Sequence, residues 1–150
     1  MIAAALAFAL ATTPAAPGCS GTLSGSVTGA FTCDASLADT GGGATALVLT
    51  PRGPIDGVPS YAPGAFELPG KPAPGTYTLA TLGPGRASVA AEGGTLYTAT
   101  KTSSQRGEVT LVLSSVRREG GRLVPHGTYR ARLVPAGGGK TGEVVVEVRF

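Results

Sequence analysis

The chain is built from short segments in which apolar and polar side chains alternate. The pattern is clearest in the last third, over residues 108–113, 128–133 and 143–150. Alternation with a period of two is typical of strands that face a core on one side and water on the other. These three segments therefore predict a three-stranded antiparallel meander, with glycine-rich turns between its strands.

Matching the apolar positions across neighbouring strands predicts the register of this meander. Val109 faces Ala131 across the first hairpin, and Tyr129 faces Val148 across the second. In this register the charged residues of the wet face meet residues of opposite charge, which stabilises a sheet modestly. The sequence predicts two cross-strand ion pairs, Glu108 with Arg132 and Arg130 with Glu147.

The spacing of the remaining apolar runs predicts an all-β fold. The 24 glycines and 12 prolines separate short alternating runs and do not form a continuous tract, so turn-rich structure fits better than disorder. We expect eight to ten short strands and no helix beyond the N-terminal segment. The predicted architecture is a two-sheet antiparallel β-sandwich, immunoglobulin-like or jelly-roll-like.

Residues 51–74 hold seven of the twelve prolines and predict a long surface crossover. At most one short strand is expected in it, at residues 65–68. Long ordered connections often carry binding functions. Tyr61 is the one aromatic residue expected to be exposed, and we predict a ligand-contact loop for a protein or glycan partner, formed by Arg52, Tyr61 and Phe66.

The N-terminal residues predict export. Residues 1–11 are almost wholly apolar, too short to span a bilayer as a helix, and end in the small-x-small pattern Ala9-Leu10-Ala11, although no Lys or Arg precedes them. We therefore expect a cleaved signal peptide at 1–11, a linker at 12–18 and a single domain at 19–150. The expected location is periplasmic, outer-membrane-anchored or extracellular.

The two cysteines allow two interpretations. Cys19 and Cys33 form a disulfide if the chain doubles back near Gly25, which pairs Leu23 with Gly29. A register that turns at Thr28-Gly29 instead leaves Cys19 beyond the end of the hairpin. The alternative to the disulfide is lipidation, because Gly18-Cys19 resembles the end of a bacterial lipoprotein signal; it would attach the chain to a membrane and leave Cys33 unpaired.

The charged and polar residues form no recognisable catalytic motif. The net charge of +3 is small and scattered, which argues against a nucleic-acid surface. The glycine clusters lack the Lys-Ser/Thr of a phosphate-binding loop, and no residues of metal-ligand type cluster in the sequence. His126, the single histidine, is expected to be structural. We therefore expect no enzyme activity and no cofactor.

Residues 64–150 resemble a group of secreted bacterial β-sandwich proteins of unknown function, many of them lipoproteins. The resemblance is carried by Pro74-Gly75-Thr76-Tyr77, by residues 103–111, by residues 126–133 and by a last strand that ends in Phe150. It implies an exported sandwich domain and no particular activity.

Two functions remain open at this point. The first is an exported, non-catalytic β-sandwich that binds a ligand or serves a structural role in the cell envelope. The second is a small eight-stranded outer-membrane β-barrel, suggested by the terminal pattern Val144-x-Val146-x-Val148-x-Phe150. The barrel would need strands of about 9 to 11 residues and two aromatic belts, whereas aromatic residues make up 5% of the chain.

Overall fold

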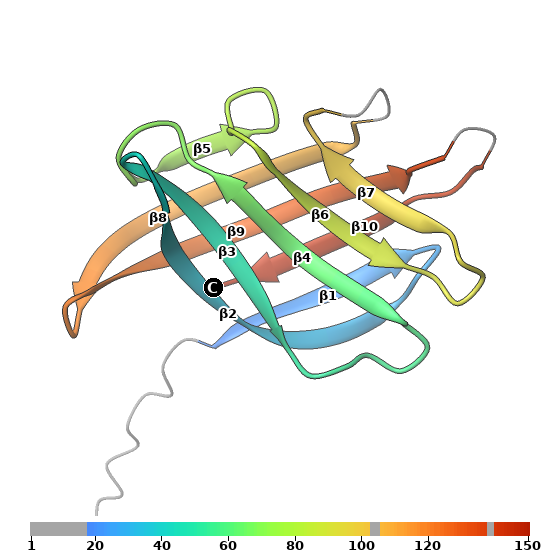
Figure 1. Ribbon diagram of the computed structural model, residues 1–150. Helices are drawn as coiled ribbons and strands as arrows, with labels where there is room; N and C mark the ends of the chain where they lie inside the picture. The colour runs from blue at the N-terminus through green and yellow to red at the C-terminus, as the bar shows by residue number, and fades with distance from the viewer. Residues whose placement is uncertain (1–17, 103–105, 138–139) are drawn as a thin grey trace, which may run out of the picture.

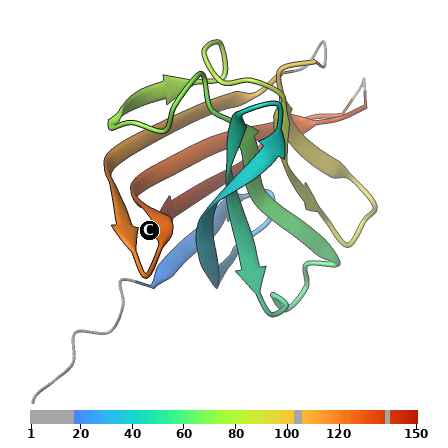
Figure 2. The same ribbon diagram turned by 60° about the vertical axis from the view of Figure 1, so that its left-hand side comes forward.

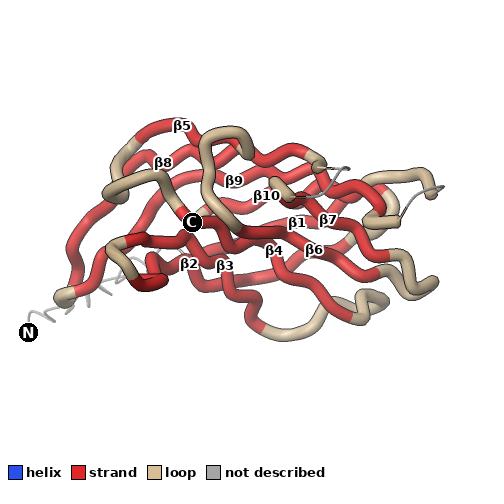
Figure 3. Tube along the Cα trace, turned by 45° about the horizontal axis from the view of Figure 1, so that its top comes forward, coloured by secondary structure: helices blue, strands red, loops and turns tan. Residues whose placement is uncertain are grey.

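The described part of the chain consists of strands and loops, with no helix, in a computed structural model (Figure 3). The structure describes residues 18–102, 106–137 and 140–150. The predicted signal peptide and nearly all of the predicted linker lie outside these ranges. The strands are β1 (Cys19–Gly25), β2 (Gly29–Gly41), β3 (Ala44–Arg52), β4 (Ser60–Glu67), β5 (Gly75–Thr78), β6 (Gly85–Ala90), β7 (Leu96–Thr100), β8 (Glu108–Glu119), β9 (Arg122–Pro135) and β10 (Val144–Arg149).

Eight of these strands close into a barrel. They pair in the order β1-β2-β3-β4-β6-β7-β9-β10, and β10 then pairs with β1. The all-β prediction is confirmed, but the two-sheet sandwich is wrong. Strand β2 is 13 residues long, and it pairs with β1 near its start and with β3 over the rest of its length. It thereby carries one continuous sheet from one wall to the other (Figure 1).

Strands β8 and β5 extend one wall beyond the closed barrel. Strand β8 pairs with β9, and β5 adds to the far side of β8; Figure 2 shows them continuing the wall formed by β9 and β10. Strand β7 meets β9 at two register pairs, Tyr97 with Pro135 and Thr98 with Val134. The closure between β7 and β9 is therefore much shorter than the other ladders of the barrel.

The meander has the register that the apolar pattern predicted. Val109 pairs with Ala131, and Tyr129 pairs with both Leu111 and Val148. All five side chains are buried. The strands themselves run further than predicted, because Gly120 and Gly121 form a two-residue turn with φ of 55° and 78°, so that β8 and β9 continue to Glu119 and Arg122.

Residues 51–74 are not a surface crossover, and this prediction is wrong. Strand β4 occupies residues 60–67 and pairs with both β3 and β6. Its proline, Pro63, lies in a β-bulge, where the β4–β6 register shifts between Ala62 and Ala65. A residue in a bulge need not donate a hydrogen bond to the neighbouring strand, so the N–H that proline lacks is not missed. Pro51 lies near the end of β3, beyond the residues that pair with β4. Neither proline interrupts its strand.

The hairpin of β1 and β2 contains the predicted disulfide. Cys19 pairs with Cys33 across the ladder, Leu23 pairs with Gly29, and the Cys19–Cys33 bond is formed. Both cysteines are buried. Closing a loop of this length contributes about 3 kcal/mol to stability in the chain-entropy account of disulfides.

Tyr129 joins the two walls through the barrel interior. Its hydroxyl lies against Gly64 of β4, where a Cβ atom would stand 2.4 Å from the Tyr129 oxygen. Only glycine at position 64 leaves room for the ring. The Tyr129 hydroxyl is buried and has no hydrogen-bond partner among the described residues, and burial raises the pKa of this phenol far above its usual range.

We predict that Tyr129→Phe raises the free energy of unfolding by about 1 kcal/mol, because it removes a buried polar group that lacks a partner. Urea denaturation would measure the change. Tyr61→Phe is the matched control: it deletes a hydroxyl that donates a 2.8 Å hydrogen bond to the Gly53 carbonyl, and it should lower stability by about 0.5–1 kcal/mol. A loss of stability in Tyr129→Phe would contradict the conclusion that the buried Tyr129 hydroxyl lacks a hydrogen-bond partner.

Candidate functional site

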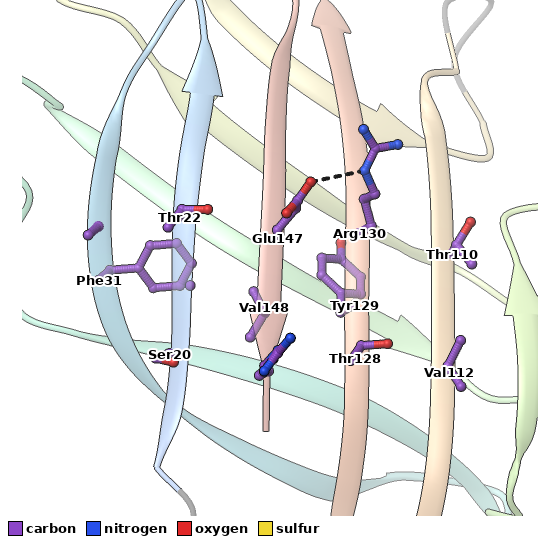
Figure 4. Close-up of a pocket in the computed structure, with 13 residues that line it drawn as sticks. Ser20, Thr22, Phe31, Thr110, Val112, Thr128, Tyr129, Arg130, Glu147 and Val148 are labelled. Atoms are coloured by element: carbon purple, nitrogen blue, oxygen red, sulfur yellow. Dashed lines mark hydrogen bonds and ion pairs between the residues drawn. The ribbon is translucent and has the colours of Figure 1, made fainter.

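A shallow groove crosses the outer face of the barrel over β2, β1, β10, β9 and β8. It encloses about 760 Å³. Its walls are outward-pointing side chains, whereas the inward-pointing residues Phe31, Tyr129 and Val148 are buried and lie beneath it (Figure 4). Alternation along each strand therefore brings together residues that are far apart in the sequence.

Two neighbouring rows of outward-pointing side chains form the groove. Most of them are small or carry hydroxyl groups, which makes the surface shallow and rich in hydrogen-bonding groups. The strand register gives the first row as Ala30, Thr22, Glu147, Arg130 and Thr110, and the second as Ser20, Arg149, Thr128 and Val112.

The two arginines of the groove differ in their partners. Arg130 Nε lies 3.2 Å from Glu147 Oε1, which neutralises its charge. Arg149 is exposed and forms no ion pair or hydrogen bond within the described part of the chain. Its register neighbours are Ser20 on β1 and Thr128 on β9. The groove thus presents one uncompensated guanidinium between two hydroxyl groups.

The other predicted ion pair lies beside the groove. Arg132 Nη2 is 3.4 Å from Glu108 Oε1, and its Nη1 is 3.4 Å from Glu143 Oε2, a second partner that the register had not indicated. The hydrogen bonds that Arg132 donates to these carboxylates, first the one to Glu108, raise the pKa of Arg132 above its ordinary value. The guanidinium is therefore held by carboxylates of two strands.

The three residues of the predicted ligand loop do not form one surface. Phe66 points into the core and is 2% exposed. Tyr61, expected to be exposed, is half-buried and packs on Phe31 with ring centroids 5.3 Å apart. Arg52 lies at the end of β3 and binds Asp34 through both carboxylate oxygens. The two hydrogen bonds that Arg52 donates to the Asp34 carboxylate lower the pKa of Asp34.

His126 lies in β9 at one end of the barrel. Its Nε2 atom is 3.8 Å from Glu119 Oε1. The nearby Ser114 hydroxyl donates to the His126 backbone carbonyl at 3.0 Å and not to its ring, so the two do not form a nucleophile–base pair. Within residues 18–102, 106–137 and 140–150, no three His, Cys, Asp or Glu side chains gather as metal ligands.

The sequence did not single out Arg149, Ser20 or Thr128 as functional residues. The only available signal was the run of Ser and Thr at every second position of residues 20–28. This run predicts a solvent-facing side of the strand but does not indicate which other residues lie beside it. The groove arises because β1 pairs with β10, at the opposite end of the chain. No local pattern marks that pairing.

Comparisons with known proteins add no family. No protein-family model matches the chain, and neither the curated proteins nor the solved structures gave a match. Among the residues that the structure describes, there is no helix long and apolar enough to cross a membrane.

We predict that Arg52→Gln returns the pKa of Asp34 toward its ordinary value of 3.8. A carboxyl whose pKa is lowered on folding stabilises the fold above its unfolded pKa, and this contribution is lost as the pH falls through the folded pKa. The stability difference between wild type and Arg52→Gln should therefore vanish in acid. NMR titration of the Asp34 carboxyl would measure the shift, with Arg86→Gln on β6 as control; an unchanged titration in Arg52→Gln would exclude the pairing.

Proposed function

We propose that the protein is an exported, non-catalytic binding module that takes an anionic ligand in the outer-face groove. Arg149 carries this proposal: it is an exposed guanidinium without a partner among the described residues, set between Ser20 and Thr128. Guanidinium groups bind carboxylates and sulfates through two parallel hydrogen bonds. Export is supported by the apolar segment at residues 1–11 and by the disulfide, which suits an oxidising compartment.

The hydroxyl groups around Arg149 favour an acidic saccharide as the ligand. Ser20, Thr22, Thr110 and Thr128 can donate to and accept from sugar hydroxyl groups. The groove has no exposed ring on which a sugar could stack, because Phe31 and Tyr129 are buried. Recognition therefore rests on charge and hydrogen bonds, and binding should be weak and sensitive to salt.

A second candidate is an outer-membrane barrel, and the closure into eight strands favours it. Of the strands in the closed barrel, β2 and β9 have 13 and 14 residues, more than the 9 to 11 or so that a span requires. Against it, β1, β4, β6, β7 and β10 have 7, 8, 6, 5 and 6 residues. The distribution of side chains favours a barrel surrounded by water: charged residues point outward from β9 and β10, while valine, leucine and phenylalanine fill the interior. Partition of the intact chain between detergent and buffer would separate the candidates.

We predict that Arg149→Gln weakens binding of an oligogalacturonate by about tenfold, because it deletes the one uncompensated charge of the groove. Isothermal titration calorimetry at low salt would measure the affinity, which should fall as salt is added. A neutral oligogalactoside should bind less tightly than the acidic one. Arg86→Gln, outside the groove, is the control; equal loss in both variants would refute a site at Arg149.

A further inference from the structure

Beyond the point where β1 begins, one edge of β2 has no neighbour within residues 18–102, 106–137 and 140–150. Strand β1 starts at Cys19, opposite Cys33, whereas β2 continues to Gly41 and pairs there with β3 alone among the described residues. The sheet thus has one long strand whose second edge carries no described neighbour. Such an edge presents unpaired backbone donors and acceptors that another strand can join.

Hydrogen bonding along β1 shows which groups of β2 face this open side. The Ser26 N–H donates to the Glu143 carbonyl of β10 at 2.9 Å, and bonding direction alternates along an antiparallel strand. The backbone N–H and C=O of Cys19 therefore point toward β2, and those of Cys33 point back toward β1. Continuing along β2 with the same alternation, the backbone groups of residues 35, 37 and 39 point to the open side.

A cleft of about 1080 Å³ lies along this edge. One side of it is β2 from Asp34 to Asp39, and the other is the tip of the β8–β9 hairpin, where Leu123 is 38% exposed. Figures 1 and 2 show this hairpin projecting at the same end of the barrel as the chain's C-terminus. The cleft therefore combines an unpaired strand edge with an exposed apolar side chain.

The charges of the hairpin tip indicate what the cleft would accept. Arg118 and Arg122 line the cleft there beside one carboxylate, Glu119, which lies 3.8 Å from the His126 ring. In the described part of the chain no ion pair joins the hairpin to β2, since Asp34 pairs with Arg52 of β3. On the β2 side the cleft is lined by Asp34, whose charge Arg52 neutralises, and by Asp39, whose Oδ1 accepts a hydrogen bond from the Gly41 N–H. The positive charge of the cleft therefore lies at the hairpin tip, where the carboxylates of a ligand would complement it.

We propose that this cleft binds an extended acidic peptide segment of a partner protein, which adds to the open edge of β2 as a further strand. Main-chain bonds to residues 35, 37 and 39 provide the affinity, carboxylates of the peptide face Arg118 and Arg122, and apolar side chains cover Leu123. This site is separate from the groove at Arg149, so the two proposals stand or fall independently.

The test uses a fluorescein-labelled, end-blocked hexapeptide of alternating valine and glutamate, with the full chain and fluorescence anisotropy. We expect Ala35→Pro to weaken binding about tenfold, because it removes one N–H from the open edge and none from the β3 ladder. Ala35→Val keeps that N–H and should bind within about twofold of wild type. A valine–lysine peptide should bind about tenfold more weakly, and Arg118→Glu with Arg122→Glu should reverse this preference.

Amide hydrogen exchange followed by NMR keeps the test decisive even if Ala35→Pro fails to fold. The amides of residues 35, 37 and 39 should exchange rapidly in the free chain and slowly with the peptide, while that of Ser36 is protected in both. Protection of all four in the free chain would mean that the chain's own residues cover the edge, and would overturn the proposal. So would absence of peptide binding up to millimolar concentration, or equal binding by Ala35→Pro and wild type.

Discussion

The pairing of β9 with three other strands is the interaction on which the rest of the structure depends. Its 14 residues pair with β10 along one edge and with β8 and then β7 along the other. The inward row of β9 supplies Tyr129, Ala131 and Leu133, all buried. Without β9, the wall of β8 and β5 and the closure of the barrel would both be lost. The two-pair ladder to β7 is then the place where the barrel is held least firmly.

Local patterns predicted the parts of the fold in which neighbours in sequence are neighbours in space. Alternation was enough to place Val109 opposite Ala131, and the cysteine geometry placed Leu23 opposite Gly29. The prediction of a surface crossover over residues 51–74 is wrong because it assumes that proline ends a strand wherever it occurs. A proline disrupts a ladder only where its missing N–H would have bonded, and Pro63 falls in a bulge. That position depends on the register, which the sequence does not state.

The groove and the cleft could not be predicted for a different reason. Ser20 and Arg149 become neighbours through the pairing of β1 with β10, a contact between the two ends of the chain that leaves no periodic signal. The wet faces themselves were predictable, since Glu108, Arg130, Arg132 and Glu147 lie outward as their parity indicated. Alternation thus says which side chains meet water, whereas topology decides which of them meet each other.

The pairing of β1 with β10 also determines when the barrel can form during synthesis. Strand β1 is the first described strand to leave the ribosome and β10 is the last of them, so the ladder between β1 and β10 cannot form until β10 has been synthesised. Until then the outer edge of β1 and the inner faces of the early strands stay uncovered. An incomplete chain is therefore an open sheet, whose uncovered edge another chain could join before β10 closes it.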